Sequence, residues 1–98
     1  MSYDLAPEAE QDLADASDYY LGEAGAAVAL SFLARFEKVA NLLVLFPSIG
    51  TKTSKGRRWF PLGDYPYSVL YREHDGVLRI SAVFHQMQRP RFWQRREP

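Results

Sequence analysis

The feature that most constrains the fold is a change of hydrophobic period at Pro47. Before this residue, apolar side chains recur every three or four positions, which is the spacing of an amphipathic helix. After it, apolar and polar side chains alternate, which is the spacing of a strand with one buried face. The chain is therefore predicted to pack a helical first half against a sheet formed by its second half.

The first half predicts two helices joined by a tight turn. A short strand over residues 3–5 precedes Pro7, which suits the first turn of a helix. Gly22 and Gly25 break the helical pattern and supply the turn, and a second helix is predicted over residues 26–45. The apolar face of the first helix is formed by Ala9, Leu13, Ala16 and Tyr20.

The second half predicts three strands, over residues 57–62, 67–73 and 77–85. Asp75 and Gly76 favour a hairpin turn between the last two strands, because this pair readily adopts positive φ. The last strand alternates cleanly between its two faces. One face is expected to pack on the helices and consists of Leu78, Ile80, Ala82 and Phe84.

The predicted architecture is a single α+β domain over residues 1–98. Its order is β-α-α-β-β-β, with a helical hairpin on one face of an antiparallel sheet. A chain of 98 residues holds one hydrophobic core. No N-terminal segment resembles an export signal, and the apolar stretches are shorter than the roughly 20 residues that span a bilayer. We therefore expect a soluble, cytoplasmic protein without a membrane partner.

The charge of the chain is zero overall but unevenly distributed. Residues 1–50 hold 2 basic and 8 acidic side chains, whereas residues 51–98 hold 10 basic and 4 acidic ones. This division favours a basic working surface in the second half, suited to an anionic partner. The alternative is a pair of ordinary solvated faces that differ in sign. Overall neutrality argues against a general nucleic-acid binder.

Metal and cofactor chemistry is not predicted. The chain has no cysteine, two histidines eleven residues apart, and no pair of carboxylates at ligand spacing. It also lacks a glycine-rich phosphate loop and any Ser-His-Asp arrangement. We therefore expect no metal and no cofactor.

Several short motifs follow one another in a fixed order. They are the acidic helix opening at residues 7–13, Gly25, Ala29 and Phe32, Pro47 and Gly50, Arg57 and Arg58, residues 67–72, Val83 and His85, and Pro90 and Trp93. In this order and spacing the chain resembles the RelE/ParE superfamily, the toxins of bacterial type II toxin–antitoxin systems, and especially its ParE-like plasmid-stabilisation members. Close relatives often carry arginine shortly after the histidine, whereas this chain has Met87 and Gln88.

The resemblance implies three candidate functions. The first is a ParE-like toxin that inhibits DNA gyrase by binding, without catalytic residues, and tolerates the missing arginines. The second is a RelE-like endoribonuclease that cleaves mRNA on the ribosome. The third is a non-toxic relic that only binds its antitoxin. All three imply a cognate antitoxin, ParD-like or related, whose extended and partly helical segment lies along the hairpin and the sheet.

Cleavage of RNA needs a base that activates the 2′-hydroxyl, cations that stabilise the phosphorane, and an acid that protonates the leaving oxygen. His85 is the candidate base, because its unperturbed pKa lies near ~6.5. Arg58, Arg72 and Arg79 are candidate phosphate clamps, and Tyr71 is a candidate acid or base-stacking ring. In the alternative interpretation, His85 only caps its strand by bonding Trp93 or the backbone, and Arg72 is a structural ion-pair partner.

The candidate partner-binding residues are basic or aromatic side chains of the second half. The aromatic content is high for so small a chain, which suggests that part of it is covered by a partner. Trp93 is also a candidate packing anchor for the chain end. The partner-binding set consists of Arg57, Arg79, Trp59, Tyr67, Arg91 and Trp93.

Overall fold

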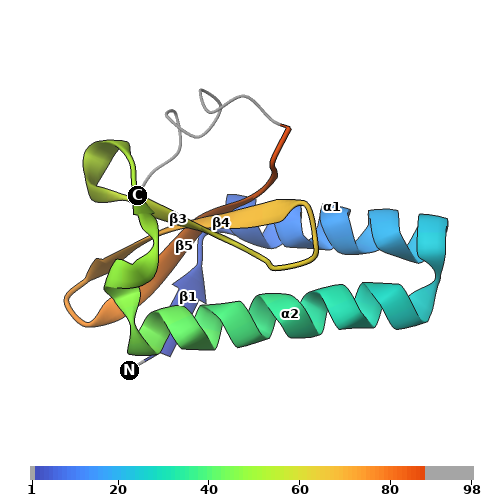
Figure 1. The fold of residues 1–98 in the computed structure, drawn as a ribbon, viewed down its shortest axis with the longest axis horizontal. Helices are drawn as coiled ribbons and strands as arrows, with labels where there is room; N and C mark the ends of the chain where they lie inside the picture. Colours follow the sequence, from blue (N-terminus) through green and yellow to red (C-terminus); the bar gives the residue numbers. More distant parts are fainter. Residues whose placement is uncertain (1, 88–98) are drawn as a thin grey trace.

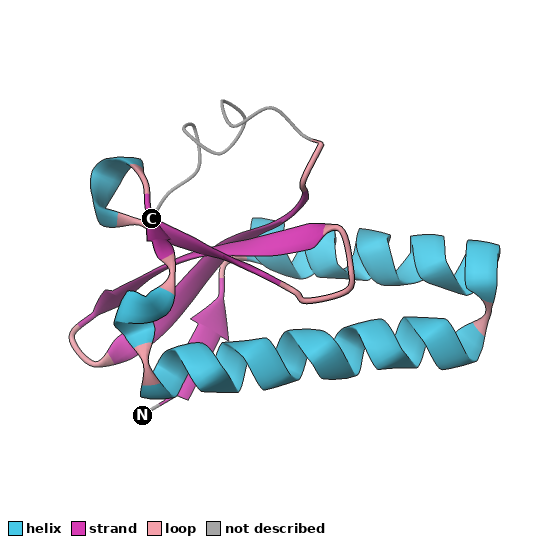
Figure 2. Ribbon diagram, in the orientation of Figure 1, coloured by secondary structure: helices cyan, strands magenta, loops and turns pink. Residues whose placement is uncertain are grey.

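The computed structural model describes residues 2–87 and contains two long helices beside a sheet (Figure 1). The elements are β1 (Ser2–Leu5), α1 (Pro7–Ala24), α2 (Ala26–Leu45), β2 (Thr51–Lys52), β3 (Arg58–Pro61), β4 (Tyr67–His74) and β5 (Val77–His85). Two 3₁₀ turns, Pro47–Ile49 and Ser54–Gly56, flank β2. The predicted α+β fold is confirmed, with helices on one face of the sheet (Figure 2).

The helical hairpin turns at a single glycine. Gly25 has a φ of 94°, and its N–H donates to the carbonyls of Tyr20 and Leu21. Pro7 occupies the first turn of α1, as predicted. Gly22, predicted as part of the break, lies inside α1. One residue with positive φ is enough to end a helix, and a glycine within it costs only about 1 kcal/mol.

The sheet is mixed, with the strand order β1-β5-β4-β3-β2. Strands β2 to β5 pair antiparallel, as expected, whereas β1 runs parallel to β5 along the sheet edge. A parallel neighbour requires a long connection, and the helical hairpin together with the other strands supplies it. Strand β2 was not predicted, because a strand of two residues is too short to show an alternation of apolar and polar side chains.

The prediction that one alternating face of β5 packs on the helices is wrong beyond Ile80. Ile80 lies opposite Tyr71, but the next residue of β4, Leu70, lies opposite Ala82. Ser81 is therefore an extra residue in a β-bulge, and its hydroxyl donates to the Leu70 carbonyl over 3.3 Å. An added residue inverts the alternation of the rest of the strand.

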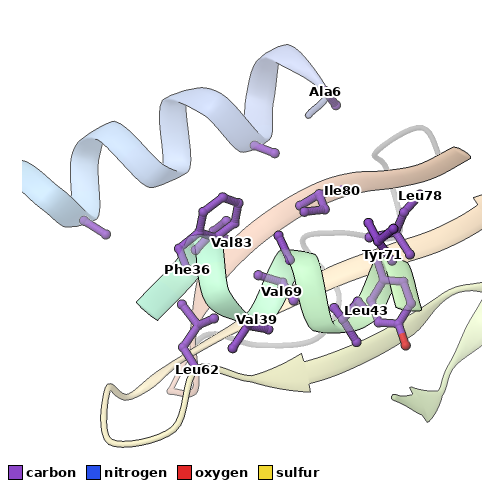
Figure 3. Packing of buried hydrophobic residues seen from close by; sticks show 14 of the residues in the cluster. Ala6, Phe36, Val39, Leu43, Leu62, Val69, Tyr71, Leu78, Ile80 and Val83 are labelled. Atoms are coloured by element: carbon purple, nitrogen blue, oxygen red, sulfur yellow. The ribbon is translucent and has the colours of Figure 1, made fainter. Parts of the chain in front are cut away.

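As a result, the buried side chains form two clusters on opposite faces of the sheet. The main cluster lies between the sheet and the helices, where Phe36, Val39 and Leu43 of α2 face Val69 and Ile80 (Figure 3). The second cluster, on the face away from the helices, consists of Leu70, Ala82 and Phe84 with Trp59 packed against them. We call this second face the outer face.

Candidate functional site

Tyr71, a candidate acid or stacking ring, is a structural residue of the core. Its side chain is fully buried, and its hydroxyl donates to the Pro47 carbonyl over 2.7 Å. The same oxygen accepts the Gly50 N–H over 3.0 Å. Burial raises the pKa of Tyr71, an effect that the Gly50 hydrogen bond and the Arg58 charge oppose. The ring therefore offers no surface on which a base could stack.

Arg58, a candidate phosphate clamp, binds the same segment of backbone. Its Nη1 donates to the carbonyls of Ser48 and Gly50 over 3.1 and 2.9 Å. Arg58 lies directly opposite Tyr71 in the sheet, so both side chains hold the turn that leaves α2. Gly50 fits this place because a Cβ there would overlap the Tyr71 hydroxyl and the Trp59 carbonyl.

The substitution Tyr71→Phe is expected to lower the free energy of unfolding by about 1–3 kcal/mol, because it leaves a buried N–H and a carbonyl without their partner. Urea denaturation measures the change. Tyr3→Phe is the control, because no hydrogen bond of its hydroxyl is found among the described residues, and it should change stability by less than about 0.5 kcal/mol. Equal stability of Tyr71→Phe and the wild type would contradict this structural role.

His85 lies at the other end of the sheet. It pairs with Tyr67 at the start of β4, and the two rings make an edge-to-face contact at 5.2 Å. Its Nδ1 accepts the Met87 N–H over 3.0 Å, so the backbone contact expected of a strand-capping histidine is present. Tyr71 lies four positions after Tyr67 in β4, a distance of about 13 Å along a strand. His85 therefore does not lie beside Arg58.

The remaining described arginines of the prediction lie on the outer face. Arg72 is directly opposite Arg79, and Arg79 forms an ion pair with Asp4 at 3.3 Å. Arg57 is fully buried, and both burial and the nearby Arg72 lower its pKa. Trp59 covers the apolar cluster of this face. The structure thus gathers Arg57, Arg72 and Arg79 into one basic patch, but separates it from His85 by the sheet itself.

The other partner-binding candidates have different outcomes. Tyr67 is half-buried on the helix side, among Tyr20, Phe32 and His85. Arg91 and Trp93 lie outside the described residues.

Among residues 2–87, no group of three His, Asp or Glu side chains could hold a metal ion. Neither described helix is both long and apolar enough to cross a membrane.

A groove between α2 and β3 was not predicted from the sequence. We call it the α2–β3 groove; its volume is about 520 Å³. Leu42 and Leu45, 37% and 71% exposed, line it together with Phe60. The other lining residues are Arg35, Lys38, Val39, Asn41, Pro61 and Gly63. The sequence signal was available, because Leu42 and Leu45 are large apolar residues off the buried stripe of α2.

The rim of the groove is basic. Arg35 and Lys38 are one helical turn apart on α2 and both line the opening. The Arg35 guanidinium lies against Gly63, where a Cβ would overlap it, and Gly63 has a φ of 67°. An apolar floor with cations on its edge suits an amphipathic segment that carries acidic residues.

The described residues form a helical hairpin packed on one face of a mixed sheet, with an exposed apolar groove between α2 and β3. The sequence model of the ParE toxin of the type II toxin–antitoxin system parDE matches residues 3–90. The chain belongs to this family. No curated protein sequence matches it.

Among solved structures, the chain is similar to one of the chromosomal ParDE TA system from P. aeruginosa. The two share 23% sequence identity with a TM-score of 0.77, over 87% of this chain and 95% of that chain. This likeness confirms the fold. Family membership also establishes a toxin of a type II system, which implies a cognate antitoxin.

Proposed function

We propose that this toxin inhibits DNA gyrase in the cytoplasm by binding, and that its antitoxin prevents this. The observation that supports a binding mode of action is the dispersal of the candidate catalytic residues. His85 lies about 13 Å from Tyr71 along the strands, Tyr71 and Arg58 hold backbone, and Arg72 occupies the outer face. Ribonuclease catalysis needs a base and cations within hydrogen-bond reach of one phosphate.

The proposed antitoxin site is the α2–β3 groove. Leu42, Leu45 and Phe60 provide apolar surface for an amphipathic helix, and Arg35 and Lys38 provide charges for its acidic residues. Helix-in-groove recognition uses apolar side chains at helical spacing in this way. The exposure of these leucines in the free chain is consistent with a surface that a partner covers.

We propose that an anionic partner makes a second contact with the toxin at the basic patch. Arg72 and Arg79 are directly opposite each other on neighbouring strands, an arrangement that repulsion disfavours. Asp4 already pairs with Arg79, so a carboxylate of the partner would bind here mainly through Arg72. Arg57 is buried beneath and would act through its charge rather than through direct contact.

The test is pulse labelling of DNA and protein synthesis after induction of the toxin in bacteria. We expect DNA synthesis to fail first. His85→Gln, which keeps a polar side chain but cannot act as a base near neutral pH, should be as toxic as the wild type. Immunoblotting controls for equal expression of the two proteins.

Other outcomes separate the alternatives. Early collapse of protein synthesis, together with a harmless His85→Gln variant, would establish the ribonuclease and refute our proposal. Normal DNA and protein synthesis at equal expression would identify a non-toxic member that only binds its antitoxin.

A further inference from the structure

A second pocket lies between α1 and the ends of β4 and β5, on the helix side of the sheet. It has a volume of about 440 Å³ and is lined by Tyr19, Tyr20, Pro66, Tyr67 and His85. We call it the tyrosine pocket. No residue of the α2–β3 groove lines it, so the two are separate surfaces. The proposed gyrase inhibition does not depend on it.

The walls of the tyrosine pocket are aromatic faces and edges. Tyr20 contacts Tyr19 at 5.5 Å and Tyr67 at 6.1 Å between ring centres, and Tyr67 contacts His85 at 5.2 Å. These contacts are edge-to-face, which leaves rings at differing orientations around the pocket. Tyr19 is 58% exposed, so its ring is available to a partner.

Burial and neighbouring phenols affect the ionisation of Tyr20 and Tyr67. The pKa of Tyr67 is raised by burial and further by Tyr19, and that of Tyr20 is raised by burial and by its tyrosine neighbours. Tyr20 and Tyr67 therefore stay neutral near pH 7. Together they present π faces and oxygen lone pairs, both of which attract a cation.

The charge of the chain around the tyrosine pocket is negative, which matches a cationic ligand. Residues 2–34 contain seven acidic side chains and no lysine or arginine. On α1, Asp15 and Glu23 lie four residues before and after Tyr19, and therefore on the same side of the helix. This acidic surround is opposite in sign to the basic rim of the α2–β3 groove.

From this geometry we infer that the tyrosine pocket binds an arginine side chain of a basic segment in a partner protein. The planar guanidinium stacks on a tyrosine ring and donates to the phenol oxygens, while the exposed acids of α1 attract the neighbouring basic residues. The toxin then has two docking surfaces of opposite charge, one for an acidic helix and one for a basic segment.

The test uses acetyl-arginine-amide and its neutral isostere acetyl-citrulline-amide, titrated into the full chain and followed through the tyrosine ring signals by NMR. We expect a saturable shift of the Tyr19 and Tyr67 signals with the arginine compound at about millimolar concentration. The citrulline compound should bind roughly tenfold more weakly. Tyr19→Leu should abolish this preference, whereas the control Leu21→Ala, on the same helix but outside the pocket, should preserve it.

Three results would overturn the inference. One is equal affinity for the two compounds, which would mean that charge is not recognised. Another is an unchanged preference in Tyr19→Leu, provided that its amide spectrum shows a folded chain. The third is a shift of the same tyrosine signals when Arg89 and Arg91 are both replaced by glutamine without any ligand, which would make the chain's own C-terminal segment the occupant.

Discussion

The substitution Leu42→Glu is expected to weaken antitoxin binding by at least roughly 30-fold, the effect typical of losing a central apolar contact. Leu42 lines the α2–β3 groove and is 37% exposed, so its side chain is open to a partner. A carboxylate there would be desolvated by the incoming helix and would repel its acidic residues. Isothermal titration calorimetry with the cognate antitoxin measures the change.

Leu30→Glu is the matched control for this experiment. Leu30 lies on the same helix, is 66% exposed and does not line the groove. Glutamate and leucine have similar helix propensities, so both variants should fold. If Leu30→Glu weakens binding as much as Leu42→Glu does, the antitoxin does not use the groove specifically. Wild-type affinity in Leu42→Glu would exclude the groove altogether.

The substitution Phe32→Ala is expected to lower the free energy of unfolding by about 3–5 kcal/mol, a large part of the stability of a chain this size. Phe32 is fully buried, and its ring contacts Tyr20, Tyr65 and Tyr67 at 5.1–5.4 Å. These residues come from α1 and from the segment that opens β4. Removing the ring therefore leaves a cavity where both helices meet the sheet.

Urea denaturation followed by circular dichroism measures this loss, with Leu30→Ala as the control. Leu30 points away from the core, so its truncation should change stability by no more than about 0.5 kcal/mol. A loss below about 1 kcal/mol for Phe32→Ala would mean that this aromatic cluster contributes little to folding.

The sequence alone determined both long helices, four of the five strands in the described part of the chain, and the family. Hydrophobic period placed α2 at residues 26–45 and β5 at residues 77–85 with the bounds that the structure has. Asp75 and Gly76 both have positive φ in the predicted hairpin turn. These features are local, because period and turn chemistry act over a few neighbouring residues. The ordered motifs also identified the toxin family correctly.

Only the tertiary structure decided which side chains meet. The bulge at Ser81 depends on pairing with β4, and it moves Ala82 and Phe84 to the outer face. As isolated residue types, Tyr71 and Arg58 were candidates for catalysis. In the folded chain, both side chains instead form hydrogen bonds with the backbone of the turn after α2. The α2–β3 groove and the tyrosine pocket each combine residues distant in the chain. Such surfaces depend on long-range packing, which a local sequence pattern does not record.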